Sequence, residues 1–557
     1  MKTPSVKCRQ RATFVILIPA LLIAGLSLIN SPSAHAAPPD PARAAFVNLF
    51  MWKWKDVARE CETYLGPKGF AAVQISPPEE HIQGSFWWIH YQPVSYQVES
   101  ELGTRTDFQD MVARCNSAGV KIYADVVINH MAAGSGTGYA GSAYSNTNHW
   151  YTFPGIYQGQ DFHWNVAGSH NCQSDVNNYD NQHAVQDCEL LGLPDLATET
   201  PYVNGRLADY LVDLYNLGVR GFRVDAAKHI DAVDISTILS NFKSKIGNKN
   251  DYYVVQEVID PGNEAVKKDW YYPNGDVNEF LYGKLLKQKF VDQRIADLST
   301  FGATWTFGSS TLGPGDKMVV FPDNHDMERG GDRGDYLHYR DDGQRSYTLA
   351  NVFMLAWPYG YPQVYSGYQF DPNTQAGRDQ GRPAVDVYVP NSGIQPTNCQ
   401  WSGGPWTCVH HWREIGNMVG FRNAAGSDAV ANWWDNGNNQ IAFGRGNKGF
   451  VVINHENAVL NRAFQTGLPA GTYCDIIAGD WNGSTCSDRT LTVDGSGLAT
   501  ISVPANYAAA IHVGAKLSVL KTTSSLNVSH NSRHVKPLSG HSHTLSRHPT
   551  NSGVTTN

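Results

Sequence analysis

The chain has 557 residues, of which 41% are hydrophobic, 17% charged and 11% aromatic. This composition excludes disordered and fibrous proteins, and the length predicts roughly two to four structural units. The formal net charge of −8 argues against nucleic acid and anionic membranes as partners, because both carry negative charge.

Residues 1–36 have the layout of a secretory signal peptide. The cations Lys2, Lys7, Arg9 and Arg11 precede the apolar run TFVILIPALLIAGLSLI, and small residues stand at Ala34 and Ala36. We therefore predict cleavage after Ala36 and a secreted, extracellular protein, whose mature net charge is about −12 because four cations are removed. A signal anchor is the alternative, since the apolar run is near the short limit for a membrane span.

The cysteines agree with export. Cleavage removes Cys8 and leaves eight cysteines, an even number that suits disulfides in an oxidising compartment. Pairing the cysteines in sequential order closes mostly local loops, so we expect Cys61–Cys115, Cys172–Cys188, Cys399–Cys408 and Cys474–Cys486. Zinc binding is the alternative, and the lack of any CxxC pair argues against it.

Apolar or β-branched runs predict strands at 45–50, 70–76, 120–129, 219–225, 252–258, 317–323 and 362–367. Helix-period stretches lie between several of them, with apolar stripes at Phe108, Met111, Val112 and Cys115 and at Leu207, Tyr210, Leu211 and Leu214. The alternation of strand and helix over roughly 330 residues indicates an α/β fold, and favours a (β/α)8 TIM barrel over an open doubly wound sheet. No GxGxxG follows an early strand, which argues against a dinucleotide-binding fold.

The barrel is expected over residues 37–130 and 199–424. The polar, Gly- and aromatic-rich stretch 131–198 is too long for a simple loop, so we predict a subdomain (domain B) inserted after the third strand. Short strands separated by turn residues predict a C-terminal all-β sandwich domain at 425–516. The tail, 517–557, has few apolar residues and is predicted to be disordered; its five histidines can bind metal, but a solvated tail is the simpler interpretation.

Charged residues gather at the ends of four predicted strands. Arg223 and Asp225 share one face of the strand in GFRVD, because side chains alternate along a strand. Asp125, Glu257 and Asp326 stand in or just after three other strands, and the carboxyl ends of TIM-barrel strands carry catalytic residues. We expect Arg223 to lower the pKa of Asp225. A structural ion pair explains these two residues alone, but a ring of mutually repelling carboxylates predicts catalysis.

Three histidines lie near these carboxylates. His130, His229 and His325 can be interpreted as ligands of a metallohydrolase centre. The chain contains no HExxH motif, which argues against that interpretation.

The four motifs DVVINH, GFRVDAAKH, QEVID and FPDNHD, in this order, resemble the signature regions of the α-amylases. This is a large family of retaining glycoside hydrolases with a (β/α)8 catalytic domain. The resemblance extends from about residue 42 to about residue 515, and includes YQPVSY and CELLGLPDL. It is strongest to the animal-type, often chloride-activated members and their bacterial relatives.

The resemblance implies roles for individual residues. Asp225 would be the nucleophile, Glu257 the general acid/base and Asp326 the carboxylate that binds and distorts the sugar ring. A retaining glycosidase needs two carboxyl groups about 5 Å apart, one of them protonated at rest. We expect the charges of Asp225 and Asp326 to raise the pKa of Glu257. The resemblance also implies substrate contacts for Asp125, His130, Arg223, Lys228, His229 and His325, and for Trp87, Trp88, Tyr91 and Gln92.

The resemblance further implies ion sites. One structural Ca²⁺ would be held by the Asn129 side chain, the Gln186 carbonyl, Asp195 and the His229 carbonyl, an all-oxygen set that suits this cation. We expect its chelation to disorder the cleft. Arg223 and Asn324 match two chloride ligands, but Gln363 stands where the family has an arginine. Because a neutral amide lacks the positive charge, we predict weak chloride binding or none.

The sequence thus predicts a monomeric, secreted, calcium-dependent enzyme that cleaves internal α-1,4 bonds in starch, glycogen and maltooligosaccharides, with no nucleic acid or membrane partner. An exo-acting or transglycosylating member of the same family would share every catalytic residue. A catalytically inactive glucan-binding protein is the third possibility, and the presence of Asp225, Glu257 and Asp326 argues against it.

Overall fold

The computed structural model describes residues 44–388, 399 and 404–518. The predicted signal peptide and nearly all of the predicted tail lie outside these residues. In the part of the chain that is described, no helix has the length and apolar character needed to cross a membrane. The exact domain bounds stay a prediction.

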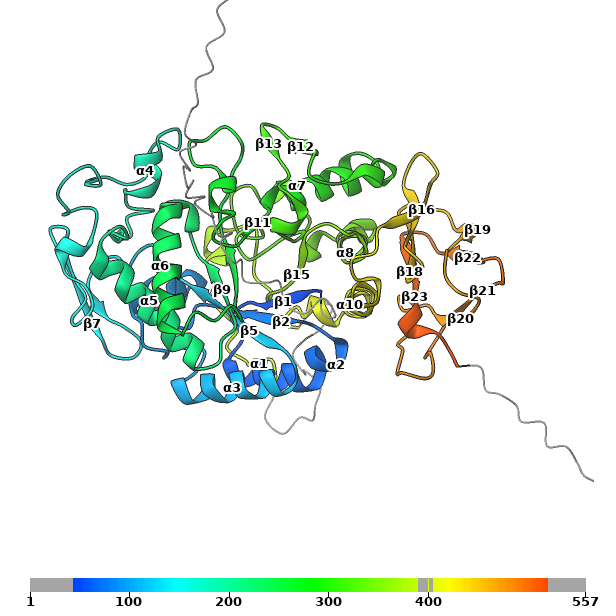
Figure 1. Ribbon diagram of the computed structural model, residues 1–557, viewed down its shortest axis with the longest axis horizontal. Coiled ribbons are helices and arrows are strands. Elements are labelled where there is room, and N and C mark those ends of the chain that lie inside the picture. The colour runs from blue at the N-terminus through cyan, green and yellow to red at the C-terminus, as the bar shows by residue number, and fades with distance from the viewer. Residues whose placement is uncertain (1–43, 389–398, 400–403, 519–557) are drawn as a thin grey trace, which may run out of the picture. The chain divides into compact units, whose positions relative to one another are not determined.

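Eight parallel strands close into a barrel in the order β1-β15-β14-β11-β10-β9-β5-β2 (Figure 1). They are β1 (Phe46–Leu49), β2 (Ala72–Ile75), β5 (Lys121–Val126), β9 (Gly221–Val224), β10 (Tyr253–Gln256), β11 (Asp276–Asn278), β14 (Met318–Val320) and β15 (Tyr361–Ser366). Almost every residue of these strands is buried, as side chains fill the barrel and helices cover its outside. The predicted (β/α)8 fold is confirmed.

Helices surround the barrel, and among the described residues the last α-helix ends just before the C-terminal strands begin. They are α1 (Trp54–Glu60), α2 (Gly66–Lys68), α3 (Arg105–Ser117), α4 (Gln182–Gln186), α5 (Pro201–Asn216), α6 (Ala232–Lys245), α7 (Phe280–Lys287), α8 (Ser346–Ala356), α9 (Gln375–Arg378) and α10 (Arg413–Ala425). The predicted apolar stripes of α3 and α5 are buried. A capping box of Thr104 and Asp107 begins α3, and Thr200 caps α5 ahead of Pro201.

The chain between β5 and α5 forms its own small structure. Three short antiparallel strands, β6 (Gly136–Thr137), β7 (Ala143–Thr147) and β8 (Trp150–Thr152), are followed by α4. A β-bridge joins His130 to Asp195, and another joins Phe162 to Leu196. The two ends of the segment are therefore held together at the carboxyl end of β5. Other short strands outside the barrel are β3 (Glu80–His81), β4 (Pro93–Ser95), β12 (Thr306–Phe307) and β13 (Ser310–Thr311).

The C-terminal strands are all antiparallel. One sheet contains β16 (Val430–Asp435), β17 (Gln440–Arg445), β18 (Gly449–Asn454) and β23 (Tyr507–His512), and two strand pairs contain β19 (Leu460–Gln465) with β22 (Leu498–Val503) and β20 (Gly471–Cys474) with β21 (Thr490–Val493). Strand β18 is buried on both faces. Phe450 and Val452 pack in the core of this domain, while Val451 and Ile453 belong to the large cluster that includes the barrel.

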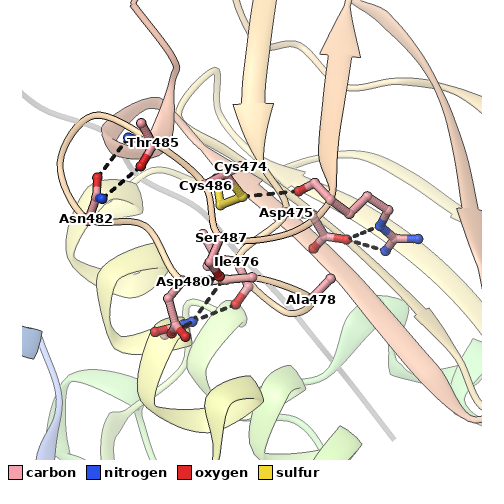
Figure 2. Close-up of a disulfide and its surroundings, with 12 residues drawn as sticks. Cys474, Asp475, Ile476, Ala478, Asp480, Asn482, Thr485, Cys486 and Ser487 are labelled. Carbon is pink, nitrogen blue, oxygen red and sulfur yellow. Dashed lines mark hydrogen bonds and ion pairs between the residues drawn. A yellow bond between two sulfur atoms is a disulfide. The ribbon is translucent and has the colours of Figure 1, made fainter.

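All four predicted disulfides are present: Cys61–Cys115, Cys172–Cys188, Cys399–Cys408 and Cys474–Cys486. Figure 2 shows the last of them, which closes a loop that carries Asp480 and is followed directly by Ser487. The side-chain amide of Asn417, in α10, donates to the Ile476 carbonyl (2.9 Å) and to Asp480 Oδ1 (3.0 Å). The disulfide-closed loop thus binds a helix that lies outside the all-β domain.

Candidate active site

The four predicted carboxylates converge at the carboxyl ends of their barrel strands. Asp125 lies in β5, in register with Arg223 of β9, while Asp225 and Glu257 directly follow β9 and β10. Asp326 lies in the segment after β14. Asp225, Glu257 and Asp326 line one cleft of about 750 Å³, together with His130, Lys228, His229, Trp87, Trp88, Tyr91 and Gln92.

Arg223 connects these carboxylates. Its Nη1 lies 2.7 Å from Asp125 Oδ1 and 2.5 Å from Asp225 Oδ1, and its Nη2 lies 2.8 Å from Glu257 Oε1. Arg223 and Asp125 are buried and are not part of the cleft lining. One guanidinium therefore fixes the positions of two cleft carboxylates through charge-assisted hydrogen bonds.

Burial dominates the electrostatics of the site. It raises the pKa of Asp125 to about 7, raises those of Asp225 and Glu257, and raises that of Asp326 well above its ordinary value. Arg223 opposes each shift. The expected lowering of the pKa of Asp225 is therefore wrong in its net direction, because burial outweighs the ion pair. The expected rise for Glu257 is present, with burial as its first cause and the charge of Asp225 adding to it.

The buried histidines of the site are neutral. Burial lowers the pKa of His130 and of His229 to about 4, and that of His325 far below its ordinary value. His130 Nε2 lies 2.9 Å from the Tyr91 carbonyl and His229 Nδ1 lies 2.8 Å from the Val185 carbonyl. His325 Nε2 instead contacts the Tyr91 hydroxyl at 3.0 Å. His325 Nε2 also lies 3.2 Å from Asp326 Oδ2. These three imidazoles do not belong to either of the candidate metal-binding groups found among the described residues.

Backbone strain stands at the centre of the site. Ala226, which follows Asp225, has a φ of 47°, in the left-handed region that non-glycine residues rarely adopt. Its N–H donates to Glu257 Oε2 at 2.9 Å. Strained residues of this kind persist where the surroundings hold them, and they cluster at active sites.

The structure adds lining residues that the sequence motifs did not identify: Tyr179, Leu190, Leu191, Leu193, Ala226, Ile259 and Glu264. Leu191 is 86% exposed. The leucine-rich run CELLGLPDL, which contains the three cleft leucines, was the available signal, because apolar side chains held at a surface mark a binding site. Lys228 forms an ion pair with Glu264 and donates to the Ile259 carbonyl at 2.7 Å, so part of its binding capacity is used within the protein.

Comparisons with known proteins agree with this geometry. Residues 63–387 match the α-amylase catalytic domain, and residues 431–514 match the α-amylase C-terminal all-beta domain.

The chain belongs to the α-amylase family.

Its relatives in this glycoside hydrolase family cover most of its length. The chain is 45% identical over 505 residues to an α-amylase of Streptomyces violaceus, which covers 91% of this chain and 80% of the relative. It is 41% identical over 517 residues to a pancreatic α-amylase of Mus musculus, covering 88% and 99% of the two chains. A mutant α-amylase I of Eisenia fetida, solved with maltohexaose, is 38% identical with a TM-score of 0.76, and the match covers 86% of this chain and 99% of that one.

The residues expected to hold Ca²⁺ in this α-amylase family member lie close together. Asn129 Nδ2 donates to Asp195 Oδ1 at 3.1 Å, and the contact of His229 with the Val185 carbonyl brings residues 186 and 229 together. His163 contacts Asp195 and the neighbour of Gln186, with Nδ1 2.6 Å from Asp195 Oδ2 and Nε2 3.7 Å from Asp187 Oδ1.

The donor set fits a hard cation. Asp195 is buried, and burial raises its pKa to about 7 although His163 opposes the shift. Among the hydrogen bonds of the described residues, none ends on the main-chain oxygens of Gln186 or His229. Two buried carbonyls and a buried carboxylate without a full set of donors suit Ca²⁺, which binds six to eight oxygen atoms.

The residues matched to a chloride site of the family are engaged with protein groups. The Asn324 side-chain carbonyl accepts from the N–H groups of Asp326 (3.0 Å) and Met327 (2.9 Å). Gln363 Nε2 donates to Gln74 Oε1 at 3.1 Å. With the guanidinium of Arg223 bound to three carboxylates, these residues present little positive charge to an anion.

Proposed function

We propose that this enzyme hydrolyses internal α-1,4-glucosidic bonds of starch, glycogen and maltooligosaccharides, with retention of anomeric configuration. The contact of Arg223 with both Asp225 and Glu257 at the cleft carries the proposal, because a retaining glycosidase needs two carboxyl groups held close together. The α-amylase names of the relatives and the maltohexaose complex of the Eisenia fetida protein support the substrate class.

The mechanism is a double displacement. The Asp225 carboxylate attacks the anomeric carbon while the Glu257 carboxyl gives its proton to the departing glycosidic oxygen, so one C–O bond breaks and an ester forms. The Glu257 carboxylate then takes a proton from water, whose oxygen attacks the same carbon and releases Asp225. The raised pKa of Glu257 favours the protonated form needed first, and Asp326 lines the cleft where it can bind the sugar.

The walls of the cleft suit a glucan chain. Trp87 and Tyr91 begin and end a 3-10 helix at the cleft, and the Trp88 ring is stacked at 4.9 Å on Phe86. Flat rings bind the apolar faces of pyranoses, while the neutral His130 and His229 offer hydrogen bonds to hydroxyl groups. We assign Trp87, Trp88, Tyr91 and Gln92 to substrate binding.

The decisive experiment compares the wild-type protein with Glu257→Gln on soluble starch. We expect rapid loss of iodine colour and α-anomeric maltooligosaccharides of mixed length from the wild type, and loss of at least about 10³-fold in kcat for the variant, because the proton donor is removed. Glu62→Gln is the matched control, since Glu62 forms an exposed ion pair with Arg114. Slow colour loss with one small product would indicate an exo-acting or transferring enzyme, and binding without cleavage would refute the proposal.

We further propose that the protein is secreted, since the predicted signal peptide and four disulfides fit an oxidising compartment. We also propose that Asn129, Gln186, Asp195 and His229 hold one Ca²⁺. When bound, the cation supplies positive charge between β5, the inserted segment and the loop after β9.

Chloride is expected to have little effect on this enzyme. Gln363 and its partner Gln74 are neutral, and Arg223 is already bound to carboxylates. We therefore predict less than about two-fold change in kcat/KM when a chloride-free preparation is titrated with chloride at constant ionic strength, with acetate as the control anion. A strong, saturable activation specific to chloride would contradict this prediction.

A further inference from the structure

Two imidazoles and one buried carboxylate meet outside the cleft. Glu60 Oε1 lies 3.2 Å from His410 Nε2 and 2.6 Å from His411 Nε2. Glu60 and His410 are fully buried, and the His411 side chain is 19% exposed. One ligand atom from each residue lies within 4.8 Å of the others, a spacing that a single metal ion can bridge.

The local fold builds this cluster. Glu60 ends α1, and the chain continues as a π-helix, Cys61–Leu65, an irregularity that is frequent at functional sites. Tyr64 of this turn stacks on the His411 ring at 3.7 Å, and its hydroxyl donates to the His410 carbonyl at 2.9 Å. Both imidazoles are therefore held in position.

The outer atoms of the cluster also have partners. Ser366 Oγ lies 2.7 Å from His410 Nδ1, and Tyr388 donates to the second oxygen of Glu60. Metal-binding histidines typically engage their other ring nitrogen in such a hydrogen bond, which fixes the tautomer and the ring orientation.

Burial of the cluster favours a bound cation. The side chains of Glu60 and His410 are both fully buried, and a carboxyl group in the interior is stable only when it is paired or coordinates a metal ion.

We propose that Glu60, His410 and His411 form a binding site for a divalent transition-metal ion of the Zn²⁺ class, which ties α1 to the segment before α10. Two imidazole nitrogens and a carboxylate oxygen are zinc ligands, and they distinguish this site from the all-oxygen calcium set. His411 is partly exposed, so an ion can reach the cluster from its side. The ion would take the place of the hydrogen bonds between Glu60 and the two imidazoles.

The test uses the full chain, treated with a chelator selective for transition metals and then returned to Ca²⁺. Zn²⁺ is titrated by calorimetry, bound zinc is counted by elemental analysis, and Co²⁺ is used as a visible probe of tetrahedral ligation. We expect one tight zinc per chain, a rise in Tm, and at least ten-fold weaker binding in His411→Gln. Glutamine retains a donor for Glu60, so this variant preserves the hydrogen bond.

His170→Gln is the matched control, because His163, His170 and Asp187 form the other candidate metal group among the described residues. The control is expected to bind zinc like the wild type. Three results would each overturn the proposal: no tight zinc in the wild type, zinc lost from His170→Gln and retained by His411→Gln, or zinc retained equally by all three proteins.

Discussion

The guanidinium of Arg223 contacts three of the four carboxylates, and its fork geometry matters as well as its charge. Its two terminal nitrogens contact Asp225 and Glu257 separately. Lysine carries a single ammonium and cannot bridge the two groups in this way. Four carboxyl groups near one cation cannot all be ionised, so their titrations are coupled and the bound protons are distributed over the group.

The positions of these side chains were predictable, but their protonation was not. Alternation of side chains along the strand placed Arg223 and Asp225 on one face. Because catalytic residues of TIM barrels lie at the carboxyl ends of the strands, both were expected at that end of the barrel. The net direction of the pKa shift of Asp225 depends on how much water the folded cleft excludes, and that follows from packing between distant segments. The sequence shows that Arg223 lies near Asp225, but it does not show how deeply the Asp225 carboxyl group is buried.

Glu79 gives a prediction on stability against pH. It is fully buried, and burial raises its pKa to about 8, although hydrogen bonds from the Tyr210 hydroxyl (2.6 Å) and the Val127 N–H (2.9 Å) oppose the shift. Between about pH 4.5 and about pH 8 the unfolded chain has lost this proton and the folded chain retains it. Its contribution to stability is therefore complete below this window, and declines by about 1.4 kcal/mol per pH unit as pH rises through it.

Glu79→Gln removes this titration with little change of shape. We expect the variant to gain stability relative to the wild type from pH 5 to pH 8, by several kcal/mol in total, measured as the free energy of unfolding in urea at each pH. A constant difference between the two proteins across this range would show that Glu79 is ionised in the folded state.

At the scale of elements, seven of the eight barrel strands were predicted from apolar runs. The exception, β11, has three residues and only Val277 among them is apolar, so no run marks it. Asp276 accepts from the Tyr253 hydroxyl at 2.7 Å, a contact between neighbouring strands that no local pattern reveals. The leucines that line the cleft were not predicted as site residues. They belong to the inserted segment, and their place in the cleft depends on how that segment packs against the barrel.

The inserted segment gives the second stability prediction. Calcium bound to Asp195 and the Gln186 carbonyl would hold this segment to the barrel, so a chelator is expected to lower Tm and to abolish hydrolysis reversibly. Asp195→Asn is expected to lower Tm in the presence of Ca²⁺ and to weaken the response to the chelator. Asp180→Asn, an exposed residue of the same segment, is the control. A Tm of the wild type that is independent of Ca²⁺ would contradict the assignment.

At the scale of the whole molecule, Arg445 joins the all-β domain to the barrel helices. It is fully buried in β17 and donates to the carbonyls of Ala356 (2.7 Å), Gly426 (2.7 Å) and Asp428 (2.6 Å). Arg445→Met leaves three carbonyls without these donors, so we expect a loss of at least about 3 kcal/mol in unfolding free energy. The exposed Arg462→Met is the control, and calorimetry is expected to give one transition for the wild type. Separate transitions would show that the domains unfold independently.

Because both faces of β18 are buried, the structure limits where the chain can be truncated or fused to another protein. A strand with apolar side chains toward both neighbours belongs to two cores at once, so the C-terminal sheet is not a detachable module. Truncation near residue 426 would expose an apolar surface on the catalytic part and a matching apolar surface on the removed fragment. Exposed apolar surfaces of this kind promote aggregation. Fusion partners are better attached beyond Leu517, whose N–H still donates to the Thr472 carbonyl at 2.8 Å.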